Sequence, residues 1–240
     1  MQSFSKDVPK YFDLTKTSKL TADLLSDAGD KHGARFKLFV TNEKHPYEEL
    51  ARFVEFTVFH HQFDYSYQSY HAHYAKYGHS STFIIVVDTD EKIPMGSIRI
   101  NVDSHEGFPA ERILREVWNE EGMLEKLSID RKDVAEIVTW SVLPEYRGGE
   151  GNRISMQLLS ECLTQVSLVM RKSYMIAVMD LHPLKIIQQL GEPFKTMNNL
   201  SALDYDGSLC LPVYMNIPKT IERIRKDRPD IYGMLLGEKG

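Results

Sequence analysis

A glycine-rich turn lies where a strand is expected to run into a helix. Residues 146–151 read YRGGEG; the apolar stretch 134–143 before them predicts a strand, and the apolar spacing in 152–170 predicts a helix. The positive end of a helix favours a phosphate, and Arg147 and Arg153 would add guanidinium donors that suit a pyrophosphate. The alternative is a plain chain reversal, since many glycine-rich turns before helices bind nothing.

A single carboxylate stands within the apolar strand that precedes this turn. Glu136 lies between Ala135 and Ile137, in the segment VAEIV. Burial in such a strand should raise the pKa of the carboxyl group and let it accept a proton near neutral pH, which is the chemistry of a general base. The alternative is an edge residue that points to solvent or pairs with a lysine or arginine.

Aromatic rings recur every three or four residues through 53–77, which places one ring per turn on one face of a helix or of a pair of helices. This aromatic stripe consists of Phe53, Phe56, His60, Phe63, Tyr67, Tyr70, Tyr74 and Tyr77. Such a stripe is more often the face that packs on a sheet than the wall of a ligand pocket, although tyrosine hydroxyls often border a polar cavity. The histidines at 60, 61, 71 and 73 do not have the number and spacing of zinc ligands, so no metal site is predicted.

These features need a sheet to position them. Strands are expected at 35–41, 82–88, 95–102, 134–143, 174–179 and 209–216, and further helices at 18–25, 108–118, 182–190 and 218–228. Gly191 is the expected stop of the helix at 182–190, and residues 204–207 (DYDG) predict a hairpin turn. The order of strands and helices predicts one mixed α/β sheet.

Composition excludes several classes of protein. The net charge of −5 argues against a general nucleic-acid binder, which needs a basic face, and the two cysteines stand in separate apolar runs where buried thiols are the commoner state. No secretion signal and no run of about 18 apolar residues is found, so we expect a cytoplasmic protein without a membrane span.

The central segment resembles the GNAT acyltransferase superfamily. Its members carry a strand, a Val-x-Pro-x-Tyr-Arg-Gly segment, a glycine-containing pyrophosphate loop and a helix. The matching residues here are Val142, Pro144, Tyr146, Arg147, Gly148, Gly149 and Gly151, while Glu150 and Asn152 stand where the family has glycine or alanine. The resemblance covers about residues 35–217, so we expect a polar N-terminal extension (1–34), a GNAT-like domain (35–217) and a charged C-terminal helix or tail (218–240).

The resemblance implies an acyl donor and roles for the residues around it. The donor would be acetyl-CoA or a longer acyl-CoA, and Glu136 would be the general base toward an amine. Residues implied to contact the donor are Trp140, Ser141, Val142, Arg147, Gly148, Gly149, Gly151, Asn152 and Arg153. The tyrosine that usually protonates the departing thiolate is replaced by Ile187, so the proton would come from solvent or from Tyr146, Tyr174 or His182.

A finer resemblance is to the acyl-homoserine-lactone synthase and long-chain N-acyl amino acid synthase branch. It is carried by residues 88–100, 107–111, Glu136, His182-Pro183 and Tyr205. It implies an amine or amino-acid acceptor, acyl carrier protein as an alternative donor, and a substrate contact from Arg99. In the superfamily as a whole, the helices after the first strand cover the acceptor side, which implies substrate contacts from Phe63, Tyr67, Tyr70 and Tyr74. The other hypothesis is a catalytically silent ligand-binding or regulatory protein of the same fold. The acceptor, the acyl length and the oligomeric state stay open at this point.

Overall fold

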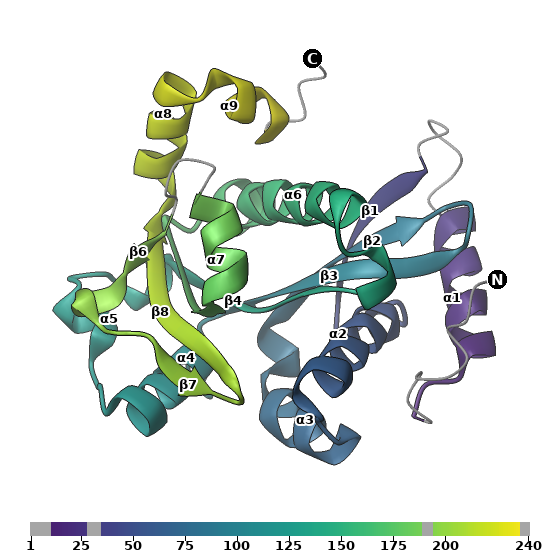
Figure 1. The fold of residues 1–240 in the computed structure, drawn as a ribbon, viewed down its shortest axis with the longest axis horizontal. Helices are drawn as coiled ribbons and strands as arrows, with labels where there is room; N and C mark the ends of the chain where they lie inside the picture. Colours follow the sequence, from purple (N-terminus) through teal and green to yellow (C-terminus); the bar gives the residue numbers. More distant parts are fainter. Residues whose placement is uncertain (1–10, 28–34, 189–193, 236–240) are drawn as a thin grey trace. The chain divides into compact units, whose positions relative to one another are not determined.

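The computed structural model describes residues 11–27, 35–188 and 194–235. Their eight strands form a mixed sheet in the order β1-β2-β3-β4-β5-β8-β6, with β7 paired to β8 (Figure 1). The chain divides into two compact units, Met1–Arg99 with Thr139–Leu158, and Ile100–Val138 with Leu159–Gly240. The mixed α/β class expected from the sequence is confirmed.

The first unit contains two complete strands, parts of two others, and the first helices of the chain. Its elements are α1 (Leu14–Asp27), β1 (Phe36–Asn42), α2 (Glu48–Phe63), α3 (Tyr67–Tyr74), a 3₁₀ turn (Ala75–Ser80), β2 (Ser81–Asp88), most of β3 (Ile93–Val102), the end of β4 (Val134–Val142), a 3₁₀ turn (Pro144–Tyr146) and the start of α6 (Gly149–Thr164). Strand β1 pairs with β2 from Phe36↔Asp88 to Asn42↔Thr82. Leu50 and Ala51 of α2 pack with Phe83 and Ile85 of β2 in one buried cluster.

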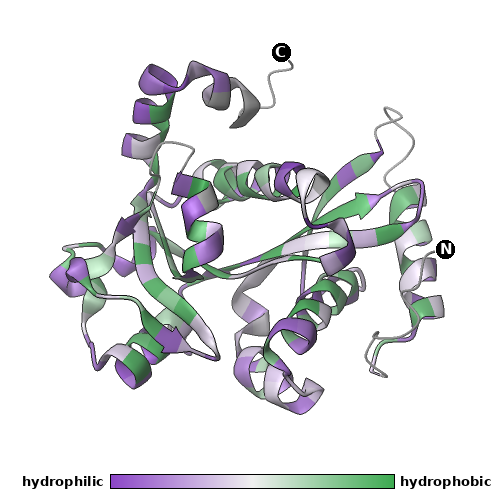
Figure 2. Cartoon of the chain, viewed as in Figure 1, coloured by the Kyte–Doolittle hydropathy of each residue, from purple (hydrophilic) through white to green (hydrophobic). Residues whose placement is uncertain are grey.

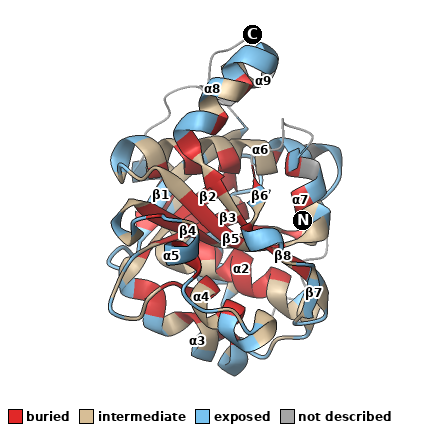
Figure 3. Cartoon of the chain, turned by 90° about the vertical axis from the view of Figure 1, so that its left-hand side faces the viewer, coloured by how far each residue is buried: buried red, intermediate tan, exposed pale blue. Residues whose placement is uncertain are grey.

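Apolar residues are concentrated on the strands that this unit buries. Strand β2 is apolar and buried along most of its length, as its hydropathy and its burial both show (Figures 2 and 3). Gly96 of β3 lies close to α6, since a Cβ added there would meet Ile154 at 3.0 Å and Leu158 at 3.1 Å. Glycine therefore allows β3 and α6 to approach each other closely.

The second unit contains the remaining strands and shorter helices. Its elements are the rest of β3, β4 and α6, then α4 (Pro109–Ile113), a π-helical turn (Leu114–Trp118), α5 (Met123–Lys126), a 3₁₀ turn (Arg131–Asp133), a π-helical turn (Gln165–Val169), β5 (Tyr174–Asp180), α7 (Leu181–Gln188), β6 (Lys195–Thr196), a 3₁₀ turn (Met197–Asn199), β7 (Leu203–Tyr205), β8 (Ser208–Asn216), α8 (Ile217–Asp227) and α9 (Pro229–Leu235). Strand β5 pairs antiparallel with β8 over its whole length, from Tyr174↔Asn216 to Asp180↔Cys210. Its parallel pairing with β4 has three residue pairs, which end at Glu136↔Ile176.

The expected elements agree with the structure in type, and three differences concern ends and short elements. Helix α6 begins at Gly149 rather than Asn152, because Gly148 makes the turn at φ +102° and its carbonyl already accepts from the Asn152 N–H at 3.0 Å. The two-residue strand β6 and the helix α9 were not expected. The predicted helix end at Leu190 and the stop at Gly191 lie outside the described residues.

The aromatic stripe runs over two helices. Asp64 ends α2 in the left-handed conformation at φ 54°, and the Ser66 side chain caps the start of α3 by accepting from the Ser69 N–H. Of the stripe, Phe53, Phe56, Tyr70, Tyr74 and Tyr77 are buried. The expectation that this face is mainly a packing face is confirmed for those rings.

Candidate functional site

Glu136 is a buried carboxyl group with one unpartnered oxygen. Its exposed fraction is 2%, its Oε1 accepts from the Ala110 N–H at 2.8 Å, and its buried Oε2 has no hydrogen-bond partner among the described residues. Burial raises the pKa of Glu136 well above its ordinary value, the Ala110 hydrogen bond opposes that rise, and the nearby Glu111 carboxylate adds to it. The alternative of a solvent-facing edge residue is thereby excluded.

The first turn of α4 holds this carboxyl group in place. Pro109 begins the helix, and the Phe108 N–H donates to the Glu111 side chain at 3.1 Å. The Ala110 N–H is one of the donors that a helix N-terminus leaves without an intrahelical partner. The Glu136 side chain, on β4, accepts a hydrogen bond from this N–H. The segment 107–111 therefore orients the carboxyl group.

The last residues of β4 carry buried polar atoms. The Trp140 Nε1 and the Ser141 Oγ are buried and have no hydrogen-bond partner within the described ranges. The Val142 carbonyl accepts from the Arg147 Nε at 3.1 Å. Strand β4 therefore ends in two unused side-chain groups and a carbonyl that is tied to the following turn.

The glycine-rich turn is exposed and shaped by two of its glycines. Gly148 has a φ of +102°, a backbone conformation that favours glycine. A Cβ on Gly151 would lie 2.6 Å from the Tyr146 carbonyl oxygen, which is too close for any other residue. A Cβ on Gly149 would meet nothing within 4 Å. The turn thus presents open space at Gly149, the start of α6, and a close backbone approach two residues later, at Gly151.

Two exposed arginines flank this turn. Arg147 also donates to the Gln62 side chain at 3.3 Å, and the Arg153 guanidinium lies 5.6 Å from the centre of the Phe36 ring. Both side chains, like that of Asn152, are exposed. The structure brings the predicted phosphate-contacting residues together on one turn, and their contact with a donor stays a prediction.

The candidate acids differ in environment. Tyr146 is half-buried, and burial together with Asp88 and Glu91 raises its pKa to about 12, so its hydroxyl keeps its proton at neutral pH. Tyr174 is half-buried on β5, and His182 is exposed on α7. Ile187, at the position where the superfamily has tyrosine, is buried in α7.

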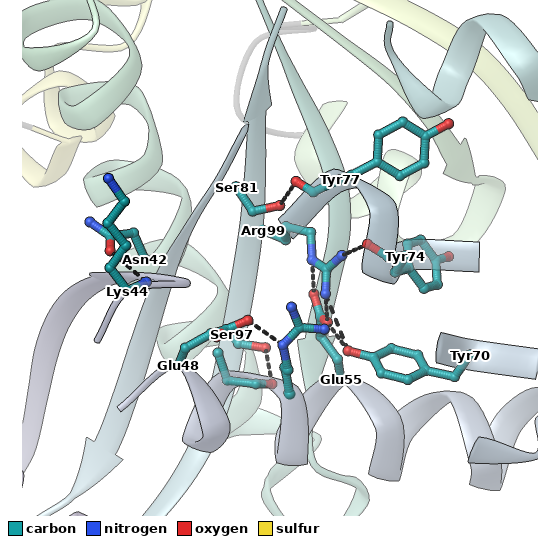
Figure 4. Close-up of polar contacts among 12 residues, drawn as sticks. Asn42, Lys44, Glu48, Glu55, Tyr70, Tyr74, Tyr77, Ser81, Ser97 and Arg99 are labelled. Carbon is teal, nitrogen blue, oxygen red and sulfur yellow. Dashed lines mark hydrogen bonds and ion pairs between the residues drawn. The ribbon is translucent and has the colours of Figure 1, made fainter. Parts of the chain in front are cut away.

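A buried polar cluster, which the sequence did not predict as a unit, joins two helices and two strands of the first unit. Figure 4 shows its members Glu55, Tyr70, Tyr74 and Arg99. Arg99 pairs with Glu55 through Nε to Oε1 at 3.0 Å and through a terminal nitrogen to Oε2 at 2.7 Å. Glu55 also accepts from the hydroxyls of Tyr70 and Thr139, and Arg99 donates to the Tyr74 carbonyl at 3.3 Å. We call Glu55, Tyr70, Tyr74, Arg99 and Thr139 the Glu55–Arg99 cluster.

The cluster includes Arg99, which the resemblance implies to contact substrate. Its side chain is fully buried, and its guanidinium donates to Glu55 and to the Tyr74 carbonyl; contact with a substrate stays a prediction. Tyr70 and Tyr74 are likewise buried, whereas Phe63 and Tyr67 are partly exposed. In the sequence, Glu55 is a lone carboxylate within the apolar segment FVEFTVF. A carboxylate that is buried in such a segment needs a hydrogen-bonding or charged partner, and this was the indication of the cluster.

Two further observations bear on the kind of site. Over 11–27, 35–188 and 194–235, no group of three or more histidine, cysteine or acidic residues is arranged to hold a metal ion. No helix in the described part of the chain is long and apolar enough to cross a membrane.

Comparison with known proteins identifies the fold. No protein-family profile and no curated protein sequence matches the chain. Among solved structures it is similar to FeeM, an N-acyl amino acid synthase from uncultured soil microbes (17% identity, 79% of this chain and 94% of that chain, TM-score 0.60). It is also similar to TofI (12%, 81% and 99%, TM-score 0.57) and to the AHL synthase LasI (13%, 77% and 91%, TM-score 0.54). The chain therefore has the GNAT fold.

Proposed function

We propose that the protein is an N-acyltransferase that moves an acyl group from a thioester donor to the primary amine of a small molecule. The observation that carries the proposal is Glu136. Its carboxyl group is buried, oriented by the Ala110 N–H, and keeps one oxygen unpartnered within the described residues. Burying a carboxyl group with one oxygen unpartnered costs stability, and such groups are typical of functional sites.

Direct attack on a thioester needs a proton acceptor and a proton donor. The amine loses a proton to Glu136, directly or through a water, as its nitrogen forms the C–N bond and the C–S bond breaks. The departing thiolate takes up a proton, for which the protonated Tyr146 hydroxyl is the candidate and solvent the alternative. No metal or redox cofactor enters this balance.

The donor would be held by the end of β4 and by the turn that follows. Strands β4 and β5 pair only as far as Glu136↔Ile176, while β5 goes on pairing with β8. Within the described chain, the later residues of β4 do not pair with β5, so their backbone groups on that side are suited to hydrogen-bond a pantetheine arm. Backbone N–H groups near Trp140–Val142 would meet the oxyanion of the tetrahedral intermediate. Arg147, Arg153 and the start of α6 would bind the phosphates of coenzyme A or the single phosphate of a carrier-protein arm.

The class of acceptor and donor follows from the similar proteins. FeeM is named an N-acyl amino acid synthase and LasI an AHL synthase. We infer an amino acid or a related small amine as acceptor for this chain. Acyl-CoA and acyl carrier protein are both considered as donors, because the turn departs from the usual glycine spacing in a way that a single phosphate would tolerate.

A second candidate function is a catalytically silent binding protein of the same fold. The observation in its favour is Ile187, a buried aliphatic residue in α7 at the place of the usual acid. This alternative keeps donor binding and removes turnover. It predicts that thioesters bind and that no amine is acylated.

One experiment separates these functions. The full chain is mixed with acetyl-CoA, palmitoyl-CoA or palmitoyl acyl carrier protein, and both thermal stabilisation and thiol release are followed with and without a mixture of amino acids. Amine-dependent thiol release with one donor supports the acyltransferase. Stabilisation without thiol release supports the silent protein, and neither effect with any donor contradicts both.

A further inference from the structure

The second unit contains a cavity of about 340 Å³ that lies at one end of its strands and is lined by cationic side chains. Its lining consists of Leu127, Ile129, Tyr174, Lys195, Tyr214, Asn216, Lys219, Thr220 and Arg223. This volume is within the range of pockets that bind small molecules. We call it the basic pocket.

Strand register explains why the polar side chains of the sheet gather there. Tyr174 pairs with Asn216 and Lys195 pairs with Tyr214 in antiparallel ladders, and directly paired residues share a face of the sheet. Tyr214 and Asn216 are two residues apart, so they also share that face. Three neighbouring strands thus present two phenol rings, an amide and an ammonium group on one surface.

Helix α8 adds the other cations. It begins directly after β8, with Asn216 as its N-cap, and Lys219 and Arg223 are four residues apart on one side of the helix. Leu127 and Ile129, which follow α5, supply the apolar part of the lining. The pocket therefore combines three cationic groups with an aromatic and aliphatic wall.

The charge of the pocket contrasts with that of the whole chain. Three of its lining residues are cationic and none is acidic, whereas the full sequence has a net charge of −5. Cationic groups that line one cavity attract an anion. The arrangement is therefore expected to bind anions.

The side chains, rather than the helix backbone, would make the contacts. At the start of α8 the Ile217 N–H donates to the Ser173 carbonyl at 2.9 Å, Pro218 has no N–H, and the Lys219 N–H donates to the Asn216 side chain at 3.0 Å. The backbone donors of this helix end are thus already used. Lys195 and Lys219, both exposed at the pocket, are the groups able to reach a ligand.

We propose that the basic pocket binds a small molecule that carries a carboxylate or phosphate group on an apolar or aromatic body. The anionic group pairs with Lys195 and Lys219, beside Arg223, and the apolar part packs against the tyrosines and Leu127. The lining of this pocket shares no residue with the donor-contacting turn, and the proposal does not depend on acyl transfer. Its ligand would be a substrate or an effector of the same chemical class.

The test uses two anionic probes and a neutral one that share a phenyl ring. Phenyl phosphate, phenylacetate and benzyl alcohol are titrated into the full chain by calorimetry at constant ionic strength. We expect saturable binding of one or both anions and none of benzyl alcohol; the tighter anion identifies the preferred headgroup. Because the probes contain no thioester, the result is independent of the proposed acyltransferase activity.

Matched lysine variants locate the binding. Lys195→Gln and Lys219→Gln should each raise the dissociation constant about tenfold to 100-fold, the loss expected for one charge-assisted hydrogen bond. Lys226→Gln, which removes an exposed lysine of the same helix that does not line the pocket, should leave it unchanged. Absence of saturable anion binding, or equal affinities in all three variants, would overturn the proposal.

Discussion

The Glu55–Arg99 cluster makes the most specific prediction about stability. We consider Glu55→Gln, which keeps the size of the side chain and removes its charge. In the native protein both charged side chains have an exposed fraction of 0%, and the two carboxylate oxygens accept four hydrogen bonds from Arg99, Tyr70 and Thr139. The variant leaves the Arg99 guanidinium buried without its counter-charge.

The size of the effect follows from that burial. Burial lowers the pKa of Arg99, but Glu55, Tyr70 and Tyr74 together outweigh this and the net pKa is raised, so the arginine stays charged. Breaking a buried ion pair by removing one partner costs about 3 to 5 kcal/mol. For a chain of this length, about 2 to 4 °C per kcal/mol gives a fall in melting temperature of roughly 6 to 20 °C.

The assay compares three variants by thermal and urea unfolding at pH 7. Glu49→Gln is the matched control, because Glu49 lies on the same helix and pairs with Lys16 at the surface; its loss should cost less than about 1 kcal/mol. The double variant Glu55→Met with Arg99→Met should recover much of the loss, since no charge is left buried. A free energy of unfolding for Glu55→Gln equal to that of the control would refute the reasoning.

Three further predictions concern the turn and the carboxyl group. Gly151→Ala should cost about 1 to 3 kcal/mol of unfolding free energy in urea, because its Cβ would meet a backbone oxygen, whereas Gly149→Ala should cost nothing; equal effects would contradict the geometry of the turn. Because the pKa of Glu136 is raised in the folded state, its contribution to stability is lost as pH rises above the ordinary value of 4.5, by about 1.4 kcal/mol per pH unit up to the folded pKa. Glu136→Gln should therefore gain unfolding free energy over the native protein as pH rises, and parallel pH curves would exclude the shift. Arg147→Ala should weaken coenzyme A binding in calorimetry by about 1 to 3 kcal/mol, while Arg225→Ala, at an exposed site on α8, should not; identical affinities would make the turn purely structural.

The fold was predictable where local patterns are strong. The apolar segment at β2 and the aromatic stripe at α2 and α3 gave the right element types because burial on one face sets the sequence period. The strand β6 was not predictable, since two residues carry no period and owe their conformation to pairing with Val213 and Tyr214.

The candidate site was predictable in part. Glu136 stood out as a carboxylate in an apolar strand, and its burial agrees with that expectation. The ion pair of Arg99 was not predictable, because its partner Glu55 is 44 residues away in the sequence. The basic pocket was not predictable either, because its cationic residues are also distant in the sequence. They lie on β6 and α8, and the pairing of β6 with β8, the strand before α8, brings them together.

The most direct test of the central claim is the rate of amine-dependent thiol release by Glu136→Gln compared with the native protein, at saturating donor and amine. If Glu136 is the general base, the rate should fall by about 10²-fold to 10⁴-fold while donor affinity stays the same. A rate within twofold of the native protein, at unchanged donor affinity, would contradict the account.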